Sequence, residues 1–293
     1  MISLPPHAGP LERIWHYVFL LICVLVFGFL IAPLLVILPL SFNAEPYFTF
    51  TEGMLSLDPE AYSLRWYEAL FDTNPNRENK WLEAIPNSLW IAACSTLLAT
   101  ALGTLAALGL SRSEMPFRNL IMGLLISPMI VPLIITAAGI FFFYARLNEY
   151  AELTGSFIGI VLAHTVLGTP FVVITVTATL IGFDQSLVRA GLMCGATPTR
   201  VFFKVVLPLI LPGVISGALF AFVTSFDEIV VVLFVGSVEY QTIPRQMWAG
   251  IREEISPIIL AVATLLICVS TLLMIAVEVL RRYNERQRGV TPG

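Results

Sequence analysis

The sequence predicts an all-α, polytopic membrane protein, and two features of its composition carry this prediction. Apolar residues make up 57% of the 293 residues and charged residues only 12%, with a mean hydropathy of +0.87. Average soluble proteins contain about 45–50% apolar and about 25% charged residues. Sixteen basic and 20 acidic residues are too few to cover a soluble chain of this length, so lipid must surround most of it.

Six stretches almost free of charge predict six transmembrane helices, because each exceeds the roughly 20 residues that cross a bilayer as a helix. In chain order they are residues 17–42, 84–110, 119–145, 156–182, 208–236 and 257–280. The first is too long for a secretion signal and no small-residue cleavage site follows it promptly, so we expect it to be retained. The period-two alternation of a β-barrel is missing, which leaves helices as the spanning structure.

The loop charges predict the orientation of these spans. With a cytoplasmic N-terminus, ten Lys and Arg residues lie on the inner side and six on the outer side, three of them in one long loop. This bias follows the positive-inside rule. We therefore expect a cytoplasmic segment 1–16, a six-helix domain 17–280 and a cytoplasmic tail 281–293.

Small residues recur at every fourth position in the second and fifth spans. The two stripes are Ser95, Ala99, Gly103 and Ala107, and Gly213, Gly217, Ala221 and Ser225. Such stripes let helices approach closely in lipid. We interpret them as packing within the chain, with a contact to another subunit as the alternative.

The inner loop 183–207 predicts a helix-turn-helix outside the membrane. Asp184 or Ser186 can cap a short helix, and Gly195 can end it in the left-handed conformation. Thr197 and Pro198 then fit the first positions of a second helix that leads to the membrane. Exposed apolar residues and three cations in one loop indicate a protein-binding surface; the cations are Arg189, Arg200 and Lys204.

Here the chain resembles the membrane subunits of bacterial ABC importers. Their signature loop reads Glu-Ala-Ala-x3-Gly, then nine or more residues, then Leu-Pro. The matching positions are Arg189-Ala190-Gly191, Gly195-Ala196, Phe202 or Phe203, Leu207-Pro208 and Pro212. Similarity to the spermidine/putrescine-type permeases continues over about residues 30–280, through Ser41-Phe42-Asn43, Ser63-Leu64-Arg65-Trp66-Tyr67, Ser225-Phe226-Asp227-Glu228-Ile229-Val230-Val231, Ile255-Ser256-Pro257 and Ala261-Val262-Ala263-Thr264.

The resemblance implies the type I ABC importer permease fold, with a coupling helix in this loop. The residues it implies at the ATPase contact are Arg189, Ala190, Gly195, Thr199 and Phe202. The family glutamate is replaced by Arg189, so our hypothesis is that the ATPase offers an acidic group there. The alternative is an exposed charge of little energetic weight.

The resemblance also implies the partners and location of the chain. They are a dimer of ABC ATPases, which binds ATP and Mg²⁺, a second and often nonidentical permease, an extracytoplasmic solute-binding protein, and the bilayer of the bacterial inner membrane. Neither of the two lysines follows a Gly-x4-Gly phosphate loop, so we expect no nucleotide or other cofactor in this chain. The formal charge of −4 speaks against nucleic acid as a partner.

Asp227 and Glu228 are adjacent acids in the fifth predicted span. A charge at mid-membrane costs at least about 2.5 kcal/mol, so such residues usually face water, a partner or a substrate path. At about 100° per helical residue, Asp227 shares a face with Ser216, Phe220 and Thr224, which favours it for the pathway and Glu228 for an interface or gate. The alternative is that one or both are capped, protonated or paired. His164 is interpreted as a hydrogen-bonded packing residue without an assigned role.

These observations predict a permease subunit that carries a small cationic solute, such as putrescine or spermidine. Opine-like or amino-acid-derived solutes are the alternative within the class. An intramembrane enzyme using Asp227 and Glu228 is the alternative from another class, although no second acid, histidine or metal site stands at a clear spacing. A stand-alone secondary transporter is disfavoured because no plain inverted repeat is present.

Overall fold

The computed structural model describes residues 9–74, 79–112, 114–253 and 256–287, and helices dominate these ranges. An isolated β-bridge joins Asn43 to Tyr62. The chain forms two compact units, Met1–Asp72 with Glu254–Cys268, and Thr73–Glu253 with Val269–Gly293. The all-α class predicted from composition is confirmed. Residues 1–8 of the predicted N-terminal segment and 288–293 of the predicted tail lie outside the described residues.

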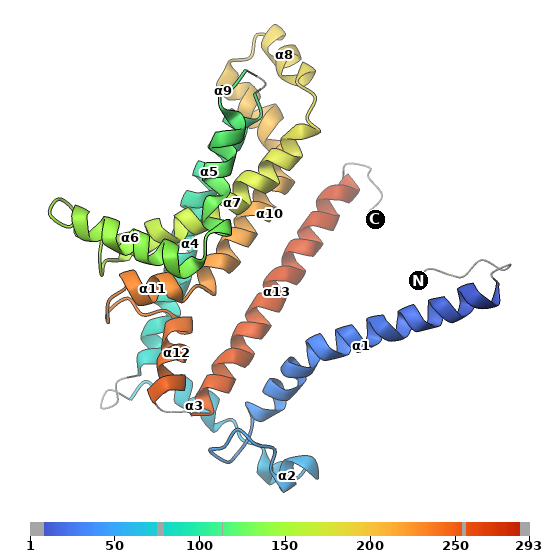
Figure 1. The fold of residues 1–293 in the computed structure, drawn as a ribbon, viewed down its shortest axis with the longest axis vertical. Helices are drawn as coiled ribbons and strands as arrows, with labels where there is room; N and C mark the ends of the chain where they lie inside the picture. Colours follow the sequence, from blue (N-terminus) through green and yellow to red (C-terminus); the bar gives the residue numbers. More distant parts are fainter. Residues whose placement is uncertain (1–8, 75–78, 113, 254–255, 288–293) are drawn as a thin grey trace. The chain divides into compact units, whose positions relative to one another are not determined.

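The first unit contains α1 (Pro10–Leu40), α2 (Glu52–Leu55), the 3₁₀ helix η1 (Pro59–Ala61) and α3 (Arg65–Leu70) (Figure 1). Helix α1 begins at Pro10 rather than at residue 17, because the Gly9 N–H donates to the Glu12 carboxyl (3.1 Å) and proline suits the first helical position. The loop after α1 folds around buried Asn43, whose side-chain amide donates to the carbonyls of Tyr47 and Thr49.

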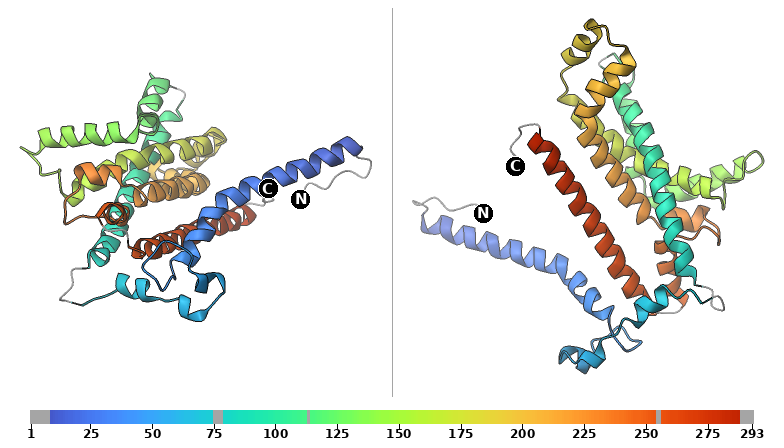
Figure 2. Two further views of the ribbon diagram at one scale, coloured as in Figure 1. Left: turned by 60° about the horizontal axis from the view of Figure 1, so that its bottom comes forward. Right: turned by 180° about the vertical axis from the view of Figure 1, so that it is seen from behind.

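The second unit is built on three packed helices, α4 (Lys80–Leu110), α7 (Phe157–Ile181) and α10 (Leu207–Phe226). Figure 2 shows these helices side by side. The small-residue stripes predicted on α4 and α10 are fully buried between them. Ala99 of α4, Val172 of α7 and Ala221 of α10 belong to one apolar cluster. The prediction that the stripes pack within the chain is confirmed.

Two of the predicted spans are not continuous helices. The stretch 119–145 forms α5 (Arg118–Ile130) and α6 (Leu133–Leu147), which are bent by 106° and visibly diverge in Figure 1. The cause is Pro132, which lacks an N–H and holds Val131 in an extended conformation with ψ 135°. The stretch 208–236 is broken between α10 and α11 (Val230–Val235). Among the described residues, five helices are long and apolar enough to span a membrane, or six if α5 and α6 count as one span.

The loop 183–207, which the charge bias predicts to be the inner loop, has the predicted helix-turn-helix form. Helix α8 (Ser186–Met193) starts where Asp184 accepts a hydrogen bond from the Ser186 N–H (2.8 Å). Gly195 follows with φ +80°, and Thr197 caps α9 (Pro198–Val201). A π-helical turn, η2 (Phe202–Val206), leads directly into α10.

Two elements complete the chain. Helix α12 (Ile243–Glu253) lies in the stretch predicted as an outer loop, and its start is held by a hydrogen bond from the Ile243 N–H to Ser88 of α4 (2.7 Å). Helix α13 (Ile258–Gln287) extends beyond the predicted sixth span into the predicted tail.

Candidate functional site

The two helix breaks of the second unit line one pocket of about 660 Å³. Its lining comes from the α5–α6 break, from α7, and from the end of α10; the residues are Pro128, Met129, Ile130, Val131, Pro132, Leu133, Leu167, Phe171, Val223, Thr224, Asp227, Glu228 and Ile229. Irregular backbone at membrane depth is tolerated where it lines a cavity. The breaks therefore place helix ends, with their polar backbone groups, at a pocket in an otherwise apolar bundle.

Asp227 is the exposed acid of this pocket. It follows the last residue of α10, and its N–H donates to the carbonyl of Val223 (3.0 Å). The sequence argument assumed a continuous helix through Asp227 and Glu228, and the break removes its basis. The placement of Asp227 and Thr224 at one pocket is nevertheless as expected. Phe220 lies outside the lining but stacks on Phe171, which is part of it (ring centroids 6.0 Å apart).

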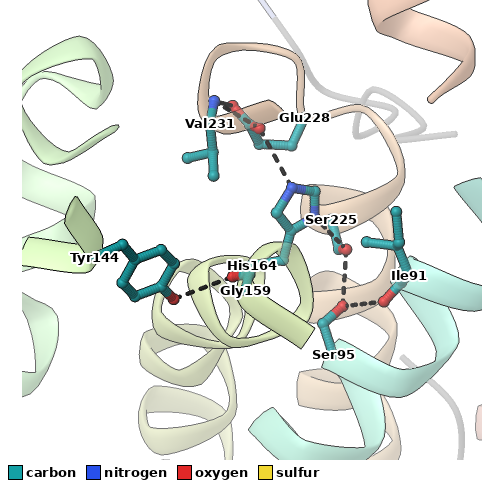
Figure 3. A network of polar contacts seen from close by, with 8 residues as sticks. All are labelled: Ile91, Ser95, Tyr144, Gly159, His164, Ser225, Glu228 and Val231. Carbon is teal, nitrogen blue, oxygen red and sulfur yellow. Dashed lines mark hydrogen bonds and ion pairs between the residues drawn. The ribbon is translucent and has the colours of Figure 1, made fainter. Parts of the chain in front are cut away.

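Glu228 has the opposite environment. It is only 4% exposed, and both of its carboxyl oxygens accept from the Val231 N–H, at 3.0 and 2.9 Å. Its Oε2 also lies 3.4 Å from Nε2 of His164, a fully buried side chain on α7 (Figure 3). The alternative considered from sequence, a capped and paired carboxyl, therefore describes Glu228 but not Asp227.

A row of polar contacts continues from His164 across the bundle (Figure 3). His164 Nδ1 lies 2.8 Å from Ser225 Oγ, which lies 2.8 Å from Ser95 Oγ, and Ser95 donates to the carbonyl of Ile91 (2.6 Å). The expectation of a hydrogen-bonded His164 is confirmed. Its pairing with Glu228 was missed because 64 residues separate the two, and the serines stood out in the sequence only as small residues.

Metal-ligating residues do not gather in the part of the chain that the structure describes: no three His, Cys, Asp or Glu side chains there could hold a metal ion. The polar side chains that line the pocket are the carboxyl groups of Asp227 and Glu228 and the hydroxyl of Thr224. Such groups bind cations and hydrogen-bond donors.

The inner loop exposes most of the residues assigned to it by resemblance. Arg189, Ala190, Gly195 and Thr199 are exposed, whereas Phe202 is half-buried against the apolar cluster of the bundle. Large apolar side chains are also exposed there, with Met193 at 90% and Phe203 at 58%.

Local geometry explains one departure of this loop from the family pattern. A Cβ on Gly191 would lie 3.0 Å from the side chain of buried Val201, so α8 and α9 approach too closely to accept alanine at residue 191 without a shift of Val201.

Hydrogen bonds from the Ser186 hydroxyl and N–H lower the pKa of Asp184, with a smaller contribution from the charge of Arg189. The ionised carboxylate therefore stabilises the start of α8.

Known proteins are similar to this chain over most of its length. Residues 99–286 match the family described as the binding-protein-dependent transport system inner membrane component. The putrescine transport system permease protein PotI of Escherichia coli (strain K12) is 33% identical over 91% of this chain and 89% of its own length. The spermidine/putrescine transport system permease protein PotC of Haemophilus influenzae is 29% identical over 89% of this chain and 95% of its own length.

A solved structure shows the same fold at low sequence identity. It is a chain of a bacterial ABC transporter involved in the import of the acidic polysaccharide alginate, with a TM-score of 0.65 and 15% identity, covering 98% of this chain and all of that one. Helices of membrane-spanning length agree with a multi-pass inner membrane protein. The chain belongs to the family of inner membrane components of binding-protein-dependent transport systems.

Proposed function

We propose that this chain forms part of the translocation pathway of an ATP-driven importer for polyamines such as putrescine and spermidine. The observation that carries the proposal is the exposed carboxyl of Asp227 in a pocket between two helix breaks. The polyamine class is supported by the names and overall similarity of the PotI and PotC permeases.

The pocket suits an ammonium group for two reasons. A carboxylate forms strong, charge-assisted hydrogen bonds with an ammonium that has lost its water. The ring of Phe171 in the same wall, stacked on Phe220, offers an aromatic face to a cation. Thr224 adds a hydroxyl. Together, these groups can replace part of the hydration shell of a small cation inside the bundle.

The proposed partners follow from the exposed surfaces and the family. The inner loop 183–207 would seat on an ABC ATPase dimer that binds ATP and Mg²⁺, since it combines cations with exposed Met193 and Phe203. Arg189 would meet an acidic group of that ATPase. A second, nonidentical permease would complete the pathway, and a solute-binding protein would dock on the outer side. Both termini would be cytoplasmic.

Replacing Asp227 by asparagine in the intact transporter tests the pathway assignment. We expect kcat/KM for uptake of labelled putrescine to fall by about 10- to 100-fold, because a hydrogen bond to a charged group contributes about 1.5–3 kcal/mol. Assembly with the partners, measured by co-purification, should be unchanged since Asp227 is exposed.

Asp227→Glu is the matched control, because it keeps the charge and should retain more uptake than Asp227→Asn. Competition with spermidine and with opine-like or amino-acid-derived solutes separates the two substrate classes. Normal putrescine uptake by Asp227→Asn would remove this residue from the pathway.

A further inference from the structure

The order of hydrogen bonds across the bundle fixes which ring nitrogen of His164 carries a proton. The Ser95 hydroxyl has one hydrogen, and its shortest contact, 2.6 Å to the carbonyl of Ile91, requires that hydrogen. Ser225 must then donate to Ser95 across their 2.8 Å contact. With the Ser225 hydrogen used, the 2.8 Å contact from His164 Nδ1 to Ser225 Oγ requires an N–H on Nδ1.

This assignment leaves Nε2 of His164 to face the carboxyl of Glu228. Nε2 carries no hydrogen bond to the protein, and it lies 3.4 Å from Glu228 Oε2 with both side chains buried. A lone pair on Nε2 facing an ionised carboxylate would leave an uncompensated charge in an apolar interior, which is strongly unfavourable. One proton between Nε2 and Oε2 removes this cost, because either position of the proton gives a pair without net charge.

We propose that His164 is the positioning residue and buried counter-group of Glu228, and that the two side chains share a single proton as a neutral pair. The Val231 N–H holds the carboxyl from the other side. Other titratable side chains on the packed elements include Tyr144 of α6, whose hydroxyl donates to the carbonyl of Gly159 (3.0 Å), and exposed Asp227.

The neutral pair determines the charge that the pocket presents. Two adjacent acids stand at the helix break, but only Asp227 then contributes a net negative charge. This consequence rests on the proposed function: one ammonium of a cationic solute would be matched by this chain. Glu228 would serve to hold the break in place through α7 and α11.

A rescue experiment in the assembled transporter tests the pair without relying on transport. His164→Asn keeps a donor near Ser225 but removes Nε2, so Glu228 becomes a buried, unpaired acid. We expect the amount of assembled complex after mild heating to fall about tenfold or more. Adding Glu228→Gln to His164→Asn should restore most of it, because the buried charge is gone.

The matched control for this rescue is His164→Asn combined with Asp227→Asn, which removes the neighbouring charge but leaves Glu228 buried and unpaired, and so should restore far less than Glu228→Gln does. Three outcomes would overturn the proposal. They are equal rescue by both second substitutions, no rescue by Glu228→Gln, and a His164→Asn complex that is as stable as the wild type. Because assembly is measured, normal uptake by Asp227→Asn would refute the pathway assignment and leave the pair intact.

A second measurement needs no substitution at the pair. Solid-state NMR of the complex, with isotopically labelled histidine in this chain and His7 and His16 replaced by glutamine, reports the protonation of each ring nitrogen. We expect a protonated Nδ1 in His164. An Nδ1 without a proton would overturn the proposal even if every His164 variant failed to assemble.

Discussion

Two glycines set the distance between α7 and α10. A Cβ on Gly213 would lie 2.2 Å from Thr179 Oγ1, and a Cβ on Gly217 would lie 2.4 Å from Thr175 Oγ1 and 2.8 Å from the Val172 Cα. The Cα of a neighbouring helix cannot move aside as a side chain can. The helices therefore require glycine at residue 217 to keep their present contact.

Gly217→Ala should destabilise the bundle by about 1–3 kcal/mol, the usual cost of overpacking a close contact. The measurement is the apparent Tm of the purified protein in detergent. Gly123→Ala on α5 is the control, because a Cβ there would meet nothing within 4 Å and alanine favours helix. A Tm for Gly217→Ala at or above that of Gly123→Ala would show that the helices separate without cost.

Sequence reasoning at single residues identified the acids and favoured Asp227 for the pathway and Glu228 for an interface or gate. Asp227 and Glu228 stand out because charged residues are rare in apolar spans. Which of them is buried was decided by contacts from distant parts of the chain, namely His164 and the Val231 N–H. The helical-wheel argument loses its basis because α10 ends at Phe226, although Asp227 does line the pocket beside Thr224.

At the scale of elements, the α8–α9 turn is the segment that the sequence predicted most fully. Its capping residues and its left-handed glycine are local signals, and local hydrogen bonds satisfy them in the structure. The broken spans were only partly foreseeable. Pro132 signals an interruption of the third span, but nothing comparable precedes Asp227, where the buried carboxyl of Glu228 accepts from the N–H of Val231 in the first turn of α11.

Gly195→Val should weaken coupling to the ATPase. Its φ of +80° is unfavourable for a side chain by about 1–2 kcal/mol, while a Cβ there would meet nothing within 4 Å. We expect less stimulated ATP hydrolysis in the assembled complex. Gly195→Asn is the matched control, because asparagine tolerates the left-handed conformation and should retain more activity. Equal activity of the two variants would mean that the turn geometry does not matter for coupling.

At the scale of the whole molecule, the charge bias predicts that the inner loop is cytoplasmic. Cys194 is exposed beside Gly195, so labelling of its thiol shows on which side of the membrane this loop lies. In a variant with Cys23, Cys94 and Cys268 replaced by serine, a membrane-impermeant maleimide should label Cys194 in inside-out vesicles but not in intact spheroplasts.

The control for this labelling places a single cysteine on the opposite side. Glu60→Cys, at an exposed position of the first outer loop, in a chain with all four native cysteines replaced, should label in spheroplasts only. The reverse pattern would mean that the orientation inferred from the loop charges is inverted.

The sequence by itself determined the membrane class, the approximate spans, the helix-turn-helix of residues 183–207 and the resemblance to importer permeases. These features depend on composition, hydropathy and hydrogen bonds between near neighbours, all of which are local. Only the tertiary structure decided that two spans are broken, that their breaks share a pocket, and that His164 lies against Glu228. Those features depend on which helix faces meet, because a polar group in an apolar bundle must find its partner wherever the fold brings one.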